Sequence, residues 1–176
     1  MPFVAKSFPV AQRYWDRYAI IVPVSKNNQS EEGDKMLRKA SAVWNGGLKD
    51  GSGKISTDSG VLSDTQYSFS TRFEDGVGTN PEELIAAAHA GCFSMALSGQ
   101  LGAAGMTAES INTTAAVRLE KLDSGFAVTS VHLDVTARIP GADETAFATA
   151  ANNAKAGCPI SKLLKAEITM DAKLEN

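Results

Sequence analysis

One long apolar segment constrains the fold of this chain more than any other feature. From Leu84 to Leu101 the apolar residues wrap almost all the way round a helical projection, whereas an ordinary surface helix carries a single apolar stripe. A helix of this kind has little surface that water solvates well. We therefore expect it to be central and enclosed on most sides, by sheet or by a partner subunit.

The beginning of this helix is explicit in the sequence. Asn80 is a favourable N-cap, Pro81 suits the first helical position, and Glu83 has the spacing of a capping box. Acidic residues in the first turn also complement the positive end of the helix dipole. We expect the helix to run to about Ala104 and to end at Gly105.

The segments on either side of this helix alternate between apolar and polar residues, which is typical of strands with one buried face. Turn residues separate them. Strands are predicted at 40–44, 54–57, 66–70, 113–122, 126–139 and 167–174, and a second helix at about 143–156, broken by Gly157, with Pro159 opening a short third helix. The pattern predicts an α+β fold with antiparallel sheets.

Length and charge narrow the class of protein. A chain of 176 residues with a net charge of −3 fits one domain with a substantial core, and offers no electrostatic reason to bind nucleic acid. Residues 1–35 contain a polar stretch and no persistent period, so we expect a weakly ordered arm before a functional domain at 36–176. No apolar run approaches the roughly 20 residues that span a membrane. A cytoplasmic location without membrane partners is expected.

Cys92 and Cys158 are the only cysteines. A chain of this length does not need a disulfide framework, so two thiols favour redox chemistry over cross-linking. Cys158 precedes Pro159, and the amides at a helix N-terminus lower a thiol's pKa. The alternatives are two inert buried thiols, or a simple kink at Cys158.

Cys92 lies in the middle of the central helix, where burial alone raises a thiol's pKa. A reactive thiolate there requires a nearby cation, and Arg72 is the candidate. Glu82 in the first helical turn is placed to hold the guanidinium in a bidentate pair. His89, one turn before Cys92, is a possible auxiliary residue that could hydrogen-bond the sulfur. Each of these residues also has an ordinary interpretation, as a surface charge or a packed histidine.

Four segments together resemble the OsmC/Ohr family of organic hydroperoxide reductases. They are Thr71–Glu74, Gly78–Leu84, Ala87–Leu97 and Ala156–Ser161. The resemblance extends from about Ala40 to the C-terminus, with Gly91 as a small departure where alanine is expected.

This resemblance implies an intertwined homodimer in which two long helices lie back to back, wrapped by sheets from both chains. Cys92 would be the peroxidatic cysteine, Cys158 the resolving cysteine, and Arg72 and Glu82 the activating pair, which either subunit could supply. The implied activity is reduction of organic hydroperoxides, and of hydrogen peroxide, in stress defence. No bound cofactor or metal is implied, and an external dithiol of the lipoyl type would be the reductant.

Two other functions are compatible with the residues. His89 and Cys92 have an H-x-x-C spacing that, with Cys158 and His132, would suit a structural zinc site. A stress protein that binds small apolar molecules and only senses oxidant is the second alternative. Metal analysis would separate the first from a peroxidase, and steady-state turnover with a dithiol would separate the second.

Overall fold

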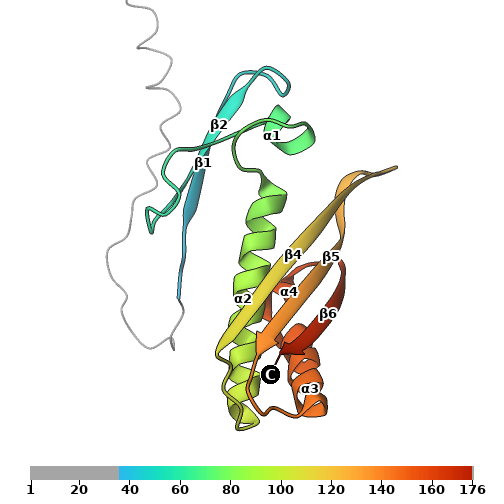
Figure 1. Cartoon of the computed structure of the whole chain (residues 1–176). Helices are drawn as coiled ribbons and strands as arrows, with labels where there is room; N and C mark the ends of the chain where they lie inside the picture. The colour runs from blue at the N-terminus through green and yellow to red at the C-terminus, as the bar shows by residue number, and fades with distance from the viewer. Residues whose placement is uncertain (1–35, 176) are drawn as a thin grey trace, which may run out of the picture. The chain divides into compact units, whose positions relative to one another are not determined.

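The computed structural model describes residues 36–175, so the expected arm at 1–35 lies outside the described residues. The description below concerns the compact unit that begins at Arg38. Its elements, in chain order, are β1 (Ala40–Asn45), β2 (Ser52–Thr57), β3 (Thr65–Ser68), α1 (Phe69–Phe73), α2 (Pro81–Ala103), β4 (Ser110–Leu122), β5 (Gly125–Arg138), α3 (Glu144–Gly157), α4 (Pro159–Leu163) and β6 (Glu167–Glu175) (Figure 1).

The first sheet is a three-stranded antiparallel meander in the order β1-β2-β3. The hairpin predicted before the central helix is therefore confirmed. The third strand is shorter than expected, because the chain turns into α1 at Phe69. Ser68 ends the strand by capping this helix: its hydroxyl accepts from the Thr71 amide, and the Thr71 hydroxyl accepts from the Ser68 amide.

Helix α2 begins and ends close to the predicted positions. The Asn80 side chain accepts a hydrogen bond from the Glu83 amide at 2.9 Å, and Pro81 is the first helical residue. Gly105 follows the helix with a φ of 75°, a conformation that glycine adopts without steric cost. The Glu83 carboxylate accepts from the Thr79 hydroxyl at 3.2 Å.

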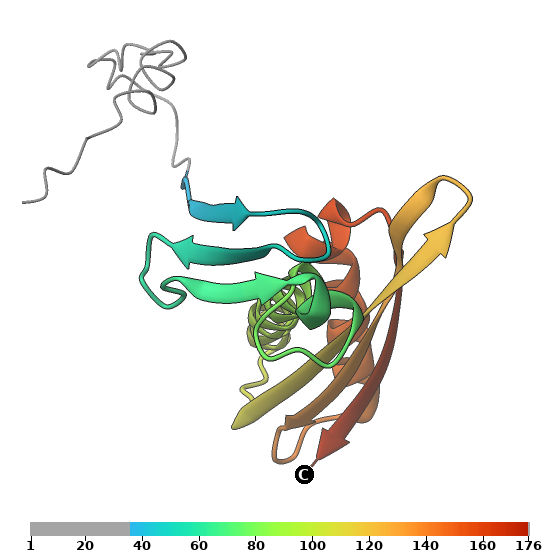
Figure 2. The ribbon, with the colours of Figure 1, turned by 90° about the horizontal axis from the view of Figure 1, so that it is seen from above.

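The second sheet has the order β4-β5-β6 (Figure 2). β4 and β5 pair antiparallel, as predicted, but β5 and β6 pair in parallel, so the expectation of antiparallel pairing throughout is wrong at this edge. The helices α3 and α4 carry the chain from the end of β5 back to the end where β5 begins. A strand that follows such a helical crossover enters the sheet parallel to the strand before it.

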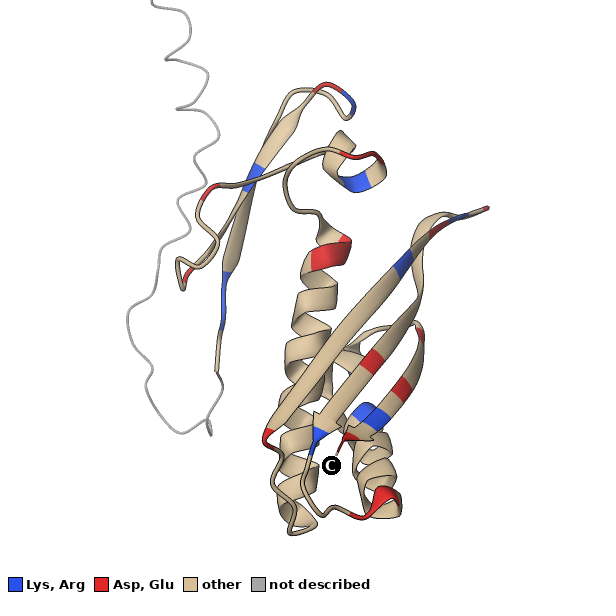
Figure 3. Cartoon of the chain, viewed as in Figure 1, with Lys and Arg blue, Asp and Glu red and all other residues tan. Residues whose placement is uncertain are grey.

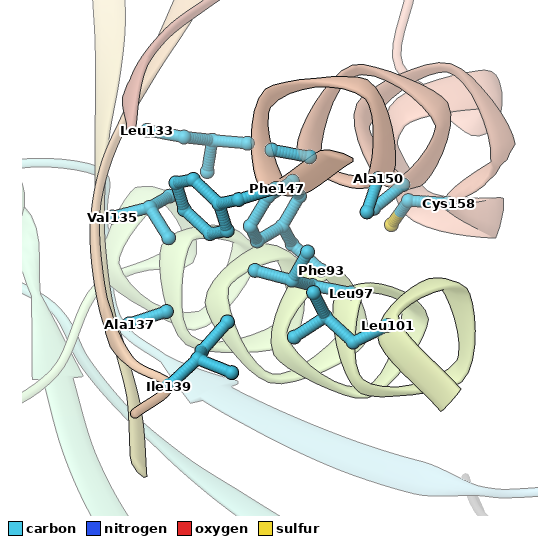
Figure 4. Close-up of a cluster of buried hydrophobic side chains, with 12 residues drawn as sticks. Phe93, Leu97, Leu101, Leu133, Val135, Ala137, Ile139, Phe147, Ala150 and Cys158 are labelled. Atoms are coloured by element: carbon cyan, nitrogen blue, oxygen red, sulfur yellow. The ribbon is translucent and has the colours of Figure 1, made fainter. Parts of the chain in front are cut away.

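The core lies between this second sheet and the helices α2 and α3 (Figure 4). Leu133 and Val135 project from β5, Phe147 from α3, and three residues of α2 complete the centre. The buried cluster consists of Phe93, Leu97, Leu101, Leu133, Val135, Ala137, Ile139, Phe147, Ala150, Ala151, Ala154 and Cys158.

The opposite face of α2 is not covered by any of the residues that the structure describes. Met95 is 79% exposed, and a Cβ added at Gly91 or Gly99 would meet no atom within 4 Å. The helix carries no charged residue after Glu83 (Figure 3). The helix has 23 residues and contains an 18-residue stretch with a mean hydropathy of 1.3, so it meets the length and composition of a membrane span, although no such run was expected from the sequence. The predicted enclosure is thus present on one side only.

Candidate active site

The two cysteine sulfurs lie 3.0 Å apart, although 66 positions separate them in sequence. Cys92 lies on α2, and Cys158 is the residue between α3 and α4 that caps the latter. Both are free thiols. A disulfide bond is about 2.05 Å long, so a movement of about 1 Å would join them. The structure brings the two predicted redox residues together.

The two sulfurs differ in depth, and in the opposite sense to the sequence-based expectation. Cys158 has no exposed surface, and it lies beside Ala150 of α3 in the core cluster (Figure 4). Cys92, which was expected to be deep in the centre of the helix, is only half-buried. The reason is that Cys92 borders the uncovered face of α2. An incoming molecule would therefore meet Cys92 first.

The surroundings also move the two thiol pKa values in opposite directions. Burial raises the pKa of Cys92, the hydrogen bond with Cys158 raises it further, and the Ile160 amide lowers it only in part. Burial acts in the same direction on Cys158, but hydrogen bonds from Cys92, from the amides of Ser161 and Ile160, and from the Ser161 hydroxyl lower its pKa below the ordinary value. Within one chain Cys158 is therefore the thiol that loses its proton more readily than Cys92.

Arg72 and Glu82 form the bidentate pair that the sequence indicated. The Arg72 Nη2 donates to Glu82 Oε1 at 2.7 Å and its Nε donates to Oε2 at 3.1 Å. The Glu82 side chain is 14% exposed and that of Arg72 35%. Such a pair fixes the plane of the guanidinium and uses two of its five N–H groups, so the other three can donate to an anion.

This pair lies far from Cys92 of the same chain. Glu82 precedes Cys92 by ten helical positions, which corresponds to about 15 Å along the helix axis. Electrostatic stabilisation of a thiolate requires a cation within about 4–6 Å. Arg72 and Glu82 are therefore not brought together with Cys92 within one chain.

His89 is completely buried on α2, and its Nε2 lies 2.8 Å from the Ser161 hydroxyl on α4. The sequence left two possibilities for His89, a hydrogen bond to the Cys92 sulfur or simple packing in the helix. The described hydrogen bond instead leads toward Cys158, through a serine that was not assigned a role. Cys158 and Ser161 have the N-cap and N3 spacing of a capping box, and this spacing is the signal that could have identified Ser161.

His132 lies on the polar face of β5, apart from the cysteines. Its Nδ1 is 2.7 Å from the Thr169 hydroxyl, and Asp134 and Asp171 flank its Nε2 at 3.4 and 3.5 Å. The neighbouring residues Val131 and Leu133, which point to the other face, are buried in the core. The structure thus does not assemble His132 with Cys92 and Cys158 as the zinc alternative requires.

An apolar cavity of about 330 Å³ opens beside Arg72. Four aromatic rings, those of Trp44, Tyr67, Phe69 and Phe73, contribute to its wall. The Arg72 guanidinium lies 5.2 Å from the centre of the Phe73 ring. A cation at the edge of an apolar cavity suits a molecule with a polar end and a hydrocarbon body.

Comparisons with known proteins identify the family of the chain. The family model described as OsmC-like protein matches residues 74–173. The chain is 55% identical over 139 residues to proteins named Peroxiredoxin OsmC from Escherichia coli (strain K12) and Shigella flexneri, a match that covers 79% of this chain and 97% of each relative.

Solved structures show the same fold. The organic hydroperoxide resistance protein OhrB of Bacillus subtilis is 26% identical with a TM-score of 0.56, covering 78% of this chain and 98% of that one. An OsmC-like protein from Mycoplasma pneumoniae has a TM-score of 0.65 at 15% identity, covering 81% and 100% of the two chains. This chain therefore belongs to the OsmC-like family.

Proposed function

We propose that this protein is a cysteine-based peroxidase that reduces organic hydroperoxides, and hydrogen peroxide, to alcohols or water. The observation that carries the proposal is the 3.0 Å separation of two free sulfurs of different depth, Cys92 and Cys158. Relatives named as a peroxiredoxin and as an organic hydroperoxide resistance protein support the same reaction.

Cys92 is the peroxidatic cysteine in this proposal, because it is the more accessible sulfur. Its thiolate attacks the terminal hydroperoxide oxygen, and the O–O bond breaks as Cys92 takes the hydroxyl group and becomes a sulfenic acid. The alkoxide that leaves takes one proton from solvent and departs as the alcohol. Cys158 then attacks the sulfenic sulfur, the S–O bond breaks, and water leaves. An external dithiol, which we propose to be of the lipoyl type, reduces the resulting disulfide. Persistently free thiols suit a cytoplasmic location.

Activation of Cys92 requires a nearby cation, and Arg72, the candidate, does not lie beside Cys92 within residues 36–175 of one chain. We propose that Arg72 of a second copy supplies it, held by Glu82, in a homodimer with two composite sites. The uncovered apolar face of α2 supports this assembly, since Gly91 and Gly99 leave room for close approach of a second helix. Burial of such a face against an identical one is favourable in proportion to the apolar area removed from water.

The cavity beside Arg72 supports a preference for organic substrates. Its wall is largely aromatic and apolar, and it would accept the hydrocarbon part of a hydroperoxide while the guanidinium faces the polar end. The physiological role that follows is defence against oxidative and osmotic stress.

A coupled peroxidase assay tests the proposal. Dihydrolipoamide serves as reductant, and cumene hydroperoxide is compared with hydrogen peroxide. The Cys92→Ser variant should lose peroxide consumption completely, whereas Cys158→Ser should consume about one equivalent and accumulate sulfenic or overoxidised Cys92, detected by mass spectrometry. Full turnover by Cys92→Ser would refute the proposed function.

A further inference from the structure

Beyond the two cysteines, a buried histidine and a serine lie in a line with the sulfurs. His89 has no exposed surface, its Nε2 is 2.8 Å from Ser161 Oγ, and its Nδ1 is buried without any hydrogen-bond partner among the described residues. A buried polar ring that is held on one side only is unusual, since nearly all buried polar atoms in proteins are paired.

The unpaired Nδ1 indicates which ring nitrogen of His89 carries the hydrogen. A neutral imidazole has one N–H donor and one acceptor nitrogen. A buried N–H without an acceptor is rarer than a buried acceptor without a donor. Burial also lowers the pKa of His89, which keeps the ring neutral. The tautomer of lower energy therefore carries the hydrogen on Nε2 and leaves Nδ1 as an acceptor without a donor. His89 then donates to Ser161 Oγ.

This donation sets the direction of the Ser161 hydroxyl. Ser161 is the third residue of α4, and Cys158 is the N-cap residue that precedes this helix. In a capping box, the side chain at this third position reaches back to the N-cap residue. With its oxygen already accepting from His89, Ser161 has one O–H left to donate. We assign the Cys158 sulfur, at the N-cap of the same short helix, as the acceptor, because the Ser161 hydroxyl is among the groups that lower the Cys158 pKa.

We propose that His89 is a positioning residue that orients the Ser161 hydroxyl toward Cys158, and that this hydroxyl holds Cys158 ready as the nucleophile of the resolving step. The inference rests on the proposed function and extends it to two residues outside the cysteine, arginine and glutamate set. Among the described residues, the groups that face the Cys158 sulfur are Cys92 on α2 and, on α4, the Ser161 hydroxyl and the amides of Ser161 and Ile160.

The step balances without a further reactant. The Cys158 thiolate gives an electron pair to the sulfenic sulfur of Cys92, and the S–O bond breaks as the S–S bond forms. The hydroxide that leaves takes one proton from solvent and departs as water. Cys158 is oxidised and Cys92 is reduced by the same amount, and His89 and Ser161 keep their protons throughout.

Single-turnover oxidation of the full-length protein tests the serine. Rapid quenching with a thiol-blocking reagent and mass spectrometry follow sulfenic acid and disulfide separately. We expect Ser161→Ala to slow disulfide formation on the order of tenfold relative to sulfenic acid formation, since a hydrogen bond to a charged group is lost. Ser161→Thr, which keeps the hydroxyl, should restore the rate. Ser124→Ala, in an exposed turn, is the matched control and should match wild type.

Two substitutions test the histidine. His89→Gln keeps an N–H donor at about the position of Nε2 but cannot titrate, so it should support disulfide formation within about threefold of wild type. His89→Leu should be as slow as Ser161→Ala. His132→Gln, at the only other histidine, should have no effect. If His89→Gln is as slow as His89→Leu while folded, the donor role is refuted in favour of proton transfer by the ring.

A second readout separates this inference from the proposed function. With Cys92 replaced by serine, the rate of Cys158 alkylation against pH reports the Cys158 pKa directly, and Ser161→Ala should raise that pKa. An unchanged titration together with an unchanged disulfide rate would overturn the inference and leave the peroxidase standing. Absence of peroxide consumption by the wild-type protein would overturn the peroxidase, whatever the titration shows.

Discussion

Cys92 and Cys158 have the same functional group, and their hydrogen-bond partners decide which of them is charged. Cys158 hydrogen-bonds with Cys92, with two backbone amides and with a hydroxyl, whereas Cys92 has only Cys158 and one amide. A thiolate gains more from hydrogen-bond donors than a thiol does. In the proposed mechanism, Cys92 therefore needs a cation from a second copy to become the attacking sulfur.

Arg72 is the group proposed to supply that charge. Replacement of Arg72 by alanine should raise the Cys92 pKa by about one to three units, which is the usual effect of losing an adjacent cation. Alkylation of Cys92 against pH, followed by mass spectrometry, measures it. Arg138→Ala is the matched control, because Arg138 pairs with Glu109 on an exposed surface. An identical titration in the Arg72 variant would remove Arg72 from the site.

His89 should make the stability of the fold depend on pH. Burial lowers its pKa below 6.5 in the folded state, so the unfolded chain binds more protons as the pH falls below about 6.5. Its contribution to stability is therefore present above that pH and is lost on acidification. Urea unfolding at pH 5 to 7.5 should show a steeper loss for wild type than for His89→Gln. Parallel curves would show that His89 is accessible to protons.

The residue types of the site could be predicted from the sequence, but the positions of these residues relative to one another could not. Cysteines, arginine and glutamate are recognisable by chemistry and spacing. Within one chain Arg72 lies far from Cys92, and in the proposed dimer its position relative to Cys92 would depend on how two copies pair, which no pattern within one sequence encodes. Ser161 was missed because a single serine after a helix-opening proline has no periodic signature, although its spacing from Cys158 carried a local one.

At the scale of elements, Asn80 connects two helices. Its side chain accepts from the Glu83 amide at the start of α2 and donates to the Thr71 carbonyl of α1 at 3.1 Å. The same residue therefore caps α2 and fixes the short helix that carries Arg72.

Replacement of Asn80 by alanine should cost about 1 kcal/mol of unfolding free energy, the usual effect of losing an N-cap, and should lower the rate of peroxide consumption by displacing Arg72. Denaturant unfolding and the peroxidase assay measure the two effects. Asn152→Ala is the control, since its side chain bonds only locally, to the Ala148 carbonyl on the same helix. Wild-type stability in Asn80→Ala would contradict the cap.

The elements with local signals were the predictable ones. Asn80-Pro81 marks a helix start, and alternation across 126–139 marks a half-buried strand, because both depend on neighbouring residues alone. The parallel pairing of β6 depends on the path that α3 and α4 take across the sheet. Helix α1 depends on the Ser68 cap, and it was not predicted because the alternation of residues in β3 continues into its sequence.

At the scale of the whole molecule, the uncovered face of α2 is the surface through which we propose that two copies of the chain associate. If a second copy covers it, a charge placed at Met95 would be buried without a partner, which proteins tolerate poorly. We expect Met95→Lys to convert a dimer to monomers and to abolish activity, as measured by light scattering and the peroxidase assay. Ala148→Lys, on an exposed position of α3, should remain dimeric. A dimeric, active Met95→Lys protein would contradict the proposed interface.

The proximity of two sulfurs 66 positions apart also has a topological consequence. A disulfide bond between Cys92 and Cys158 would close a covalent ring that contains β4, β5 and α3. This ring would reduce the number of conformations available to the denatured chain. For a ring of this size the chain-entropy relation gives about 4 kcal/mol, or a melting temperature on the order of 10 °C higher. Differential scanning calorimetry should therefore give a higher melting temperature for the oxidised enzyme, which carries the disulfide, than for the reduced enzyme that can react with peroxide.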